Sequence, residues 1–455
     1  MAERVTIFGA GPVGSLLALM LARRGFAVDV YERRPDMRVH PVAGGRSINL
    51  AVSARGLYAL HQVGLDDEVL AQAVPMPGRM VHGRDGARTF LRYGRDDSEH
   101  INSMSRGGLN KLLMTRAEAA GDVRIHFSRR LVGYHFDAGE AALRDEQTGR
   151  TERIAAPVAV GTDGSASVLR KAMGARVSES PLDFGYKELT MPPLGTGGFA
   201  LEPGALHIWP RGSYMLIALP NRDGSFTCTL FLRFEGDPSF ARLVEARSVR
   251  AFFAREFADA LPLVPDLVEQ FLAAPLGRMS TVKAWPWSRG SALLVGDAAH
   301  AIVPFFGQGM NAGFEDCTEL DALFDSRTDW EQLFARFAER RKPDTDAIAD
   351  LAVENFVEMR DRVADPRFLL EKEVEAELSR RMPGEYVSRY QLVTFTRVPY
   401  RAALEAGKIQ ASILSELCAG KARAGEIDYE RAARLVRERL SPSIPSAPPT
   451  GRGSS

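Results

Sequence analysis

The fold follows from residues 4–14, Arg4-Val-Thr-Ile-Phe-Gly-Ala-Gly-Pro-Val-Gly14, in which a short apolar run leads into the pattern GxGxxG. The apolar run predicts a buried parallel strand. A helical pattern follows from Val13 to Arg24, and Ala27 to Tyr31 predicts a second strand, directly before Glu32. Strand, glycine loop, helix, strand and acidic residue together predict a βαβ unit that binds a dinucleotide.

The glycines of this loop have separate tasks in such a unit. Gly9 allows a tight turn, Gly11 lets a pyrophosphate approach the backbone, and Gly14 permits close packing of the helix on the strand. The pyrophosphate would lie on the N–H groups at the helix N-terminus, and Glu32 would accept hydrogen bonds from the adenosine ribose. An ordinary tight turn with a surface glutamate is the alternative, but it does not explain why these features occur together. The candidate cofactor residues of this unit are Gly9, Gly11, Pro12, Val13, Gly14, Glu32 and Arg33.

Two later segments repeat the order of strand, loop and helix. The first ends in Gly161-Thr-Asp-Gly164, which a plain strand-to-helix turn explains almost as well. The second ends in Gly296-Asp-Ala-Ala-His300, where Asp297 could bind the ribityl hydroxyls that a flavin has and NAD lacks. Beyond it, Pro304-Phe-Phe-Gly-Gln-Gly-Met-Asn311 begins a helix whose N–H groups and dipole would stabilise a reduced flavin, although a glycine-rich turn with a helix cap is the alternative. We therefore predict tight, non-covalent FAD, with the further candidate contacts Asp297, Gly309, Met310 and Asn311.

The rest of the chain predicts an α/β fold in three interleaved parts. A discontinuous Rossmann-like FAD-binding domain is expected over 1–75, 105–180 and 276–328. Residues 183–235 alternate apolar and polar side chains with turn signals between them, which predicts an antiparallel β-sheet. That substrate domain is expected over 76–104 and 181–275, followed by a C-terminal helical region over 329–440 and a Pro/Ser/Gly-rich disordered tail over 441–455.

Composition narrows the function classes. The 455 residues carry 58 Lys+Arg and 58 Asp+Glu, a balance that predicts binding neither to nucleic acid nor to an anionic membrane surface. Cys228, Cys317 and Cys418 lie far apart, which favours a reducing compartment over a disulfide framework or a cysteine-ligated metal. The eight histidines show no HExxH spacing, so no metal site is predicted. With no signal peptide and no apolar stretch of about 20 residues, we expect a cytoplasmic protein without a transmembrane anchor, for which a homodimer stays open.

The three motifs in this order resemble the group A flavin monooxygenases, the aromatic hydroxylases with a single dinucleotide fold. Gly161-Thr-Asp-Gly164 has threonine where that family usually has alanine, a harmless departure. Arg106, within Ser103 to Asn110, matches the arginine that usually contacts the flavin side. The chain has no second Rossmann fingerprint, as the resemblance implies, because NADPH visits these enzymes transiently without a domain of its own.

A narrower resemblance, to the kynurenine 3-monooxygenase family, spans about residues 1–400. It is carried by Gly45-Arg-Ser-Ile-Asn-Leu50, Pro75-Met-Pro-Gly-Arg-Met80, Asp183-Phe-Gly-Tyr-Lys-Glu-Leu-Thr190, His207-Ile-Trp-Pro210, Ser225-Phe-Thr-Cys-Thr-Leu230 and residues 304–316. In that family an arginine and two tyrosines hold the substrate carboxylate, with an asparagine nearby. The matching positions are Arg79, Tyr93, Tyr390 and Asn355. An ion pair at the arginine and apolar packing of the tyrosines are the alternatives.

The resemblance implies NADPH- and O2-dependent conversion of L-kynurenine to 3-hydroxy-L-kynurenine, a step of tryptophan degradation, through a flavin C4a-hydroperoxide. It implies no catalytic triad, because the flavin carries the difficult step and the aryl amine of the substrate supplies electron density. Water has to be excluded, and Pro304, Phe305 and Phe306 could form an apolar wall over the flavin unless they are only core. Two other functions are a hydroxylase of another anthranilate-like or phenolic acid, and a flavin-binding sensor or scaffold without activity.

Overall fold

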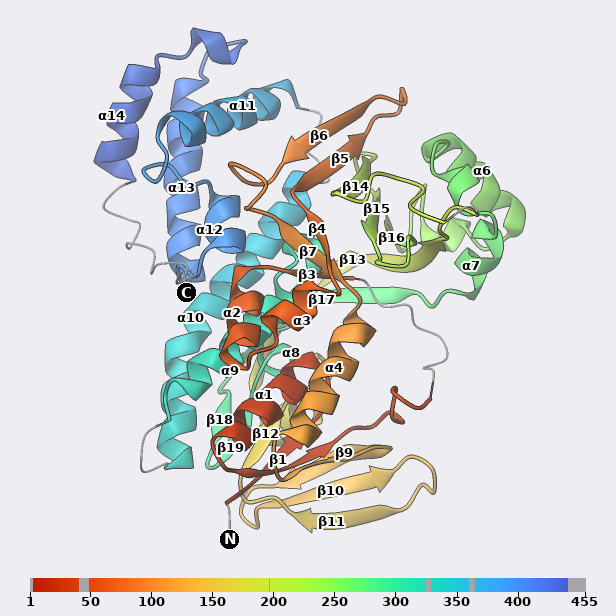
Figure 1. The fold of residues 1–455 in the computed structure, drawn as a ribbon, viewed down its shortest axis with the longest axis vertical. Helices are drawn as coiled ribbons and strands as arrows, with labels where there is room; N and C mark the ends of the chain where they lie inside the picture. Colours follow the sequence, from red (N-terminus) through yellow and green to blue (C-terminus); the bar gives the residue numbers. More distant parts are fainter. Residues whose placement is uncertain (1–2, 41–48, 196, 325–328, 360–364, 441–455) are drawn as a thin grey trace.

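Four sheets and the helices packed on them form the computed structural model, which describes residues 3–40, 49–195, 197–324, 329–359 and 365–440 (Figure 1). The predicted α/β fold class is confirmed. The tail expected to be disordered, residues 441–455, lies outside the described residues, and so do Gly45 to Ile48 of one block quoted above.

The GxGxxG unit lies at the centre of a six-stranded sheet in the order β18-β19-β12-β1-β2-β8. All its neighbouring pairs are parallel except β18 with β19. Because β1 pairs with β2 on one side and with β12 on the other, and β12 pairs in turn with β19, three distant parts of the sequence meet in this sheet. The strands are Arg4–Phe8 (β1), Ala27–Tyr31 (β2), Val123–His126 (β8), Ala159–Gly161 (β12), Ser288–Arg289 (β18) and Ala292–Leu294 (β19).

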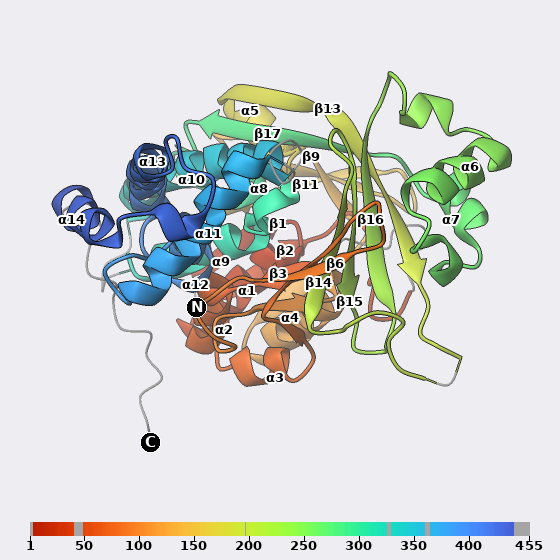
Figure 2. The ribbon, with the colours of Figure 1, turned by 90° about the horizontal axis from the view of Figure 1, so that it is seen from above.

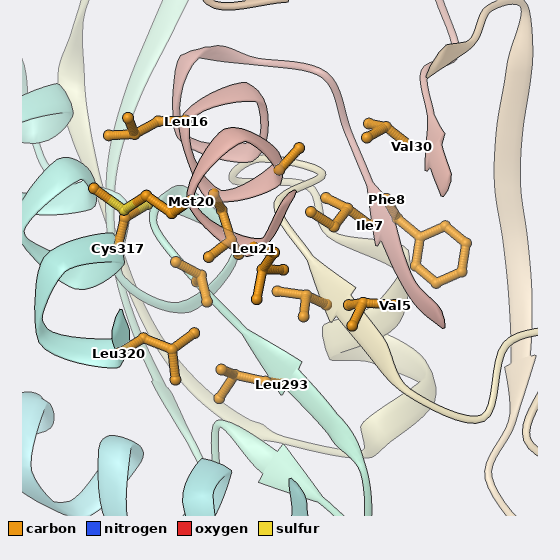
Figure 3. Close-up of a cluster of buried hydrophobic side chains, with 14 of the residues drawn as sticks. Val5, Ile7, Phe8, Leu16, Met20, Leu21, Val30, Leu293, Cys317 and Leu320 are labelled. Atoms are coloured by element: carbon orange, nitrogen blue, oxygen red, sulfur yellow. The ribbon is translucent and has the colours of Figure 1, made fainter. Parts of the chain in front are cut away.

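Three helices pack on this sheet and on each other: α1 (Pro12–Arg23), α4 (Arg106–Ala119) and α9 (Gly309–Asp321). Leu16 and Leu21 of α1 share one fully buried cluster with Val5 of β1 and Leu320 of α9 (Figure 3). Burial of each such side chain contributes roughly 1.5–3 kcal/mol. The predicted strands at 4–8 and 27–31 are confirmed, and the first helix begins and ends one residue earlier than predicted.

A seven-stranded sheet in the order β17-β13-β16-β15-β14-β5-β6 forms the second layer. It is antiparallel except where β14 runs parallel to β5. The last two strands in this spatial order, β5 and β6, come from an earlier part of the sequence, since β6 ends at Arg92 and the next strand of the sheet, β13, begins at Arg176. The strands are Gly78–His82 (β5), Arg88–Arg92 (β6), Arg176–Met191 (β13), Ala205–Pro210 (β14), Met215–Pro220 (β15), Phe226–Arg233 (β16) and Gly277–Trp285 (β17).

The domain limits expected from the sequence stay a prediction. The strands β13 and β17 show how the FAD-binding part and the substrate-domain sheet are connected. β17 was expected within the FAD-binding segment 276–328, yet it pairs along its length with β13 in the seven-stranded sheet. These two long strands run from the six-stranded sheet into the substrate-domain sheet (Figure 2). On the outer face of the seven-stranded sheet lie α6 (Ala246–Glu256) and α7 (Leu267–Ala273), which share a buried cluster with it.

The C-terminal region is helical, as predicted. Its helices are α10 (Trp330–Val357), α11 (Pro366–Arg381), α12 (Arg389–Phe395), α13 (Tyr400–Leu417) and α14 (Tyr429–Arg439). They pack on the face of the seven-stranded sheet opposite α6 and α7, because Met215 and Phe231 of that sheet belong to the same buried cluster as Ile348 and Leu392 of the helices. In the part of the chain described, no helix combines the length and the apolar character that crossing a membrane requires.

Smaller elements complete the fold. A three-stranded sheet of β9 to β11, which the sequence reading missed, flanks the six-stranded sheet, and β3, β7 and β4 form another. The remaining elements used below are Leu50–Val52 (β3), Ala54–Gln62 (α2), Asp66–Leu70 (α3), Val74–Met76 (β4), Ile101–Met104 (β7), Arg129–His135 (β9), Glu140–Asp145 (β10), Thr151–Ala155 (β11), Val168–Met173 (α5), Asp297–His300 (α8) and a 3-10 turn at Pro304–Phe306 (η3).

Candidate active site

A cavity of about 300 Å³ lies between the six-stranded sheet, the seven-stranded sheet and the C-terminal helices. It brings together fourteen of the predicted site residues, which are Gly11, Pro12, Val13, Arg79, Tyr93, Arg106, Asp297, Pro304, Phe305, Phe306, Gly309, Met310, Asn355 and Tyr390. Gly9, Gly14, Glu32, Arg33 and Asn311 lie outside its lining. The cavity therefore joins the predicted flavin loops to the predicted substrate residues.

The three glycines of the first loop differ in what surrounds them. A Cβ on Gly14 would lie 2.0 Å from the Gly9 carbonyl oxygen, and one on Gly9 would lie 2.5 Å from the Thr162 carbonyl oxygen. Gly9 also has a φ of +109°, which a side chain disfavours. A Cβ on Gly11 would meet nothing within 4 Å. The loop is thus tightly packed on two sides and open at Gly11, as a pyrophosphate site requires.

Glu32 ends β2 behind this loop and is buried. Its Oε2 accepts a hydrogen bond from the Ala10 backbone N–H at 2.9 Å, which ties the strand end to the loop. Its Oε1 accepts from the backbone N–H and the Nε–H of Arg34 at 3.0 and 2.8 Å. The guanidinium that pairs with Glu32 therefore belongs to Arg34, and Arg33, predicted to contact the cofactor, is exposed beside it.

Asp297 begins α8 and is exposed, whereas its neighbours Val295 and Ala298 are buried. Its carboxylate thus faces the cavity from a buried stretch. Gly296 before it adopts a φ of +63° and its N–H donates to Asp316 Oδ2 at 3.0 Å. Asp316 is also bonded to His300 Nε2 at 2.5 Å and to Arg341 Nε at 2.7 Å. Burial alone would raise the pKa of Asp316, but His300 and Arg341 outweigh it and lower that pKa, so a fixed carboxylate anchors the turn.

The turn after α8 forms part of the cavity wall. Pro304, Phe305, Phe306, Gly309 and Met310 line it, and Gly307 allows the tight bend with a φ of +65°. Asn311 has a different position: its Oδ1 accepts from the Ser53 N–H at 3.0 Å, and its Nδ2 donates to the carbonyls of Ala51 and Gly307. The Asn311 side chain is therefore committed to backbone groups that join α9 to β3 and α2.

Arg106 lines the same end of the cavity as the first loop. It is the first residue of α4, after Ser105, whose Oγ accepts the Gly108 N–H at 3.3 Å and caps the helix. Thr162 and Gly164 of the segment Gly161-Thr-Asp-Gly164 also line the cavity, while Asp163 accepts the Val168 N–H at 2.7 Å. The Asp163 carboxylate therefore stabilises the N-terminus of α5.

At the end of the cavity formed by the seven-stranded sheet and α12, Arg79 lies close enough to Tyr93 and Tyr390 for its charge to act on both phenols. Arg79 is on β5, Tyr93 follows β6, and Tyr390 is on α12. The two phenol rings stack with centroids 5.1 Å apart, and Tyr390 stacks in turn on Phe306 at 5.5 Å. Burial raises the pKa of Tyr93 to about 12, against the opposing charge of Arg79, and burial and Tyr93 raise that of Tyr390 further. Both phenols are therefore neutral hydrogen-bond donors at physiological pH.

The Arg79 guanidinium is half-buried in the cavity wall, and none of the described residues forms an ion pair with it. The ion pair that was the alternative for this residue is thus not seen in the described part of the chain. A half-buried guanidinium beside two neutral phenols is a site for a carboxylate, which it can grip through two parallel N–H groups.

Asn355 on α10 also lines the cavity, but its Nδ2 donates to the Phe305 carbonyl at 2.7 Å. The same Nδ2 contacts Met359 Sδ at 3.5 Å. Asn355 thus holds the η3 turn against α10, and its amide nitrogen is not free to bind a substrate in this arrangement.

Apolar residues that the sequence reading did not single out form the middle of the cavity. Leu206 of β14, Met215 and Ile217 of β15, and Phe231 of β16 project from one face of the seven-stranded sheet beside Arg79. The strand prediction over 183–235 was the available signal, because residues two apart share a face of a strand. Asp297 is the one carboxylate among the described lining residues, and the described residues hold no cluster of three or more metal-ligating side chains.

Comparison with known proteins agrees with this geometry. A family model described as an FAD binding domain matches residues 3–349. The kynurenine 3-monooxygenase of Myxococcus xanthus (strain DK1622) is 55% identical over 445 residues, which cover 97% of this chain and 96% of that protein. The kynurenine 3-monooxygenase of Stenotrophomonas maltophilia (strain K279a) is 49% identical over 441 residues, covering 96% and 97%.

Solved structures of more distant proteins share the fold. The 2-methyl-3-hydroxypyridine-5-carboxylic acid oxygenase superposes with a TM-score of 0.66 at 23% identity, over 81% of this chain and 95% of that one. PqsL of P. aeruginosa, in complex with 2-aminobenzoylacetate, superposes with a TM-score of 0.62 at 24% identity, over 80% and 98%. At these identities the likeness concerns the fold alone.

Proposed function

The chain belongs to the kynurenine 3-monooxygenase family of FAD-dependent aromatic monooxygenases, and from that membership we propose that it hydroxylates L-kynurenine at ring position 3. NADPH would be the electron donor and O2 the source of the oxygen atom. The observation that carries the substrate class is Arg79, a guanidinium in the cavity wall beside two neutral phenols and without an ion pair among the described residues.

The residues at the other end of the cavity fit FAD. The open side of Gly11 would take the pyrophosphate, and Asp297 would accept hydrogen bonds from the ribityl hydroxyls. The N-terminus of α9, which begins at Gly309, would supply backbone N–H groups and a positive dipole end for the flavin ring. When bound there, FAD supplies activation of O2 once NADPH has reduced it, which is chemistry that no side chain offers.

The task of the protein is then to place the substrate. Arg79 would grip the amino-acid carboxylate, with Tyr93 and Tyr390 as directed donors. Because Arg79 belongs to the seven-stranded sheet and the glycine loop to the six-stranded sheet, a substrate held by its carboxylate at Arg79 would extend its ring toward the flavin loops. Fixing that ring in one orientation is the contribution that proximity makes to such a reaction.

The middle of the cavity would keep water away from the reacting ring. Leu206, Met215, Ile217 and Phe231 contribute apolar side chains from the sheet, and Phe305 faces them with its ring 5.0 Å from that of Phe231. The described lining contains neither histidine nor lysine that could act as a base. The aryl amine of kynurenine would therefore supply the electron density for hydroxylation, with no proton transfer to the protein required.

Anaerobic stopped-flow reduction of the bound flavin by NADPH, with and without L-kynurenine, tests this proposal. We expect L-kynurenine to accelerate reduction and, after oxygen-18 gas is admitted, one labelled oxygen atom to appear in 3-hydroxy-L-kynurenine by mass spectrometry. NADH in place of NADPH tests the electron donor. Acceleration by anthranilate or a phenolic acid but not by L-kynurenine would move the assignment to another aromatic acid.

A further inference from the structure

Arg55 of α2 is a buried arginine that joins the FAD-binding part to the C-terminal helices. Its Nε–H donates to Glu315 Oε1 of α9 at 2.9 Å, and its terminal N–H groups donate to three backbone carbonyls between α12 and α13. Those carbonyls belong to Val393 at 2.5 Å, Thr396 at 2.8 Å and Val398. One fully buried guanidinium therefore fixes the segment that links the helix of Tyr390 to the next helix.

Tyr400, the first residue of α13, lies directly beneath this arginine. The Arg55 guanidinium carbon is 3.9 Å from the centroid of the Tyr400 ring, and that of Arg341 is 5.9 Å away. Two cations over one aromatic ring hold its position, since each is attracted to the face of the ring. The ring is fully buried, so this geometry is set by packing on all sides.

The Tyr400 hydroxyl connects the buried arginine Arg55 to a residue that lines the cavity. It donates to Gln308 Oε1 at 2.9 Å, and Gln308 Nε2 donates to Ser53 Oγ at 3.2 Å. Gln308 lies between Gly307 and Gly309, directly before α9, and lines the cavity although it is nearly fully buried. Its carboxamide retains one N–H and one lone pair beyond these two bonds.

We propose that Tyr400 is a positioning residue for the reaction: through its hydroxyl it fixes the orientation of the Gln308 carboxamide at the flavin end of the cavity. This inference rests on the proposed function. The two ends of a carboxamide have nearly the same shape, so packing alone does not distinguish a rotated form in which N–H and carbonyl exchange places. A phenol whose ring lies under two cations is a strong donor to Oε1, so it stabilises the form in which Oε1 faces Tyr400. The C-terminal region thereby determines which polar group of Gln308 faces the reacting ring.

The chemistry of Tyr400 supports a task for the hydroxyl itself. Phenylalanine would satisfy the packing and the cation contacts of the ring equally well. A buried hydroxyl without a partner is costly, and Gln308 is its hydrogen-bond partner among the described residues. Burial also raises the pKa of Tyr400, so the phenol remains a donor at physiological pH.

A double-mutant cycle of Tyr400→Phe and Gln308→Leu in the full-length FAD-loaded protein tests this inference. Tyr429→Phe is the matched control, because the Tyr429 hydroxyl also makes one hydrogen bond, to the Ala424 carbonyl, and its ring also lies under an arginine, Arg381. The readouts are the fraction of NADPH consumption that ends in hydrogen peroxide, the KM for L-kynurenine, and the change in the visible flavin spectrum when L-kynurenine binds.

We expect Y400F to keep FAD and a KM within about 2-fold of the wild type, while the ratio of peroxide to hydroxylated product rises about 2- to 12-fold, the range of one neutral hydrogen bond. The flavin spectral change should differ from that of the wild type, and Y429F should match the wild type in all readouts. In the Gln308→Leu background, Y400F should add no further loss, because its effect passes through Gln308.

Additive losses in the double mutant, or a normal peroxide ratio and spectrum in Y400F, would overturn the inference. Should Y400F fail to retain FAD, Q308N carries the same test from the other partner, since it withdraws the carboxamide from the phenol, and normal coupling there would overturn the inference equally. Failure of the wild-type protein itself to hydroxylate L-kynurenine would instead reject the proposed function.

Discussion

Tyr93 and Tyr390 lie face to face with ring centroids 5.1 Å apart and an interplanar angle of 17°. One follows the edge strand β6 of the seven-stranded sheet, and the other is on the short helix α12. A second contact joins α12 to the segment that follows β6, because Gln391 Nε2 of α12 donates to Glu99 Oε2 at 3.2 Å. The proposed carboxylate site therefore exists only where the C-terminal helices meet the substrate sheet, and neither part forms it alone.

Arg79→Ala should raise the KM for L-kynurenine about 10- to 100-fold, because hydrogen bonds to a charged partner contribute about 1.5–3 kcal/mol. FAD content should not change, since Arg79 lies at the end of the cavity away from the glycine loop. Steady-state kinetics and the flavin absorbance of the purified protein measure both. Arg88→Ala on the neighbouring strand is the control, because Arg88 is exposed and does not line the cavity. An unchanged KM in Arg79→Ala would reject the carboxylate role.

Tyr93→Phe should raise the same KM about 2- to 12-fold, as expected for one neutral hydrogen bond. Because the pKa of Tyr93 is raised to about 12, the phenol stays protonated and remains a donor from about pH 7 to pH 9. The ratio of mutant to wild-type KM should therefore be constant over that range. Kinetics at several pH values, with Tyr58→Phe outside the cavity as control, measure it. A ratio that falls toward unity as the pH rises would show that the phenol ionises.

Gly11→Ala and Gly14→Ala should fail for different reasons. Gly11 has an ordinary φ of −71° and open space around its Cβ position, so the alanine variant should fold with an unchanged thermal midpoint without FAD. It should bind FAD about 10-fold more weakly or worse, because the new methyl group enters the proposed pyrophosphate space.

Gly14→Ala should lose stability by about 1–3 kcal/mol or more, because its Cβ overlaps the Gly9 carbonyl. Circular dichroism of the FAD-free proteins and FAD titration separate the two, and equal behaviour of both variants would contradict the assignment.

The sequence allowed the βαβ unit to be placed within one residue because its determinants are local: an apolar run, three glycines and one acid within the first strand pair. It also led to Arg79, Tyr93 and Tyr390 through matched blocks, and the structure brings these three together. It did not single out Arg55 or Gln308 as site residues, because their partners lie between 92 and 343 residues away and a buried ion pair has no sequence signature.

The roles of other predicted residues could not be predicted from the sequence either, because they depend on which neighbouring group forms a hydrogen bond with each polar atom. Asn311 and Asn355 have side chains suited to a ligand, yet the structure commits their amide nitrogens to backbone carbonyls. Glu32 pairs with Arg34 instead of the adjacent Arg33. Strand register likewise decided that Leu206 and Ile217 face the cavity, and a one-residue slip would have turned them away from it.

His207 gives the fold a dependence on pH that is separate from the cavity. It is buried on β14, where Nε2 donates to the Glu202 carbonyl at 2.8 Å and Nδ1 is 2.9 Å from His82 Nε2. Since Nε2 carries the hydrogen, Nδ1 must accept from His82, and a second proton on His207 would break that bond. Burial lowers the pKa of His207 to about 4, with the nearby His82 and Arg88 charges adding to it and the Glu202 carbonyl and Asp259 opposing it.

In the folded state His207 therefore stays neutral at pH values at which the same side chain in the unfolded chain, with a pKa near 6.5, binds a proton. The free energy of unfolding should be unaffected by His207 above about pH 6.5 and should fall by about 3 kcal/mol as the pH drops toward 4. Urea unfolding of the FAD-loaded protein at about pH 7, 6 and 5 measures this decline. His207→Gln, which can still donate to Glu202, should show a shallower decline, whereas His61→Gln, at an exposed site on α2, should follow the wild type. Parallel declines in His207→Gln and the wild type would place the titrating group elsewhere.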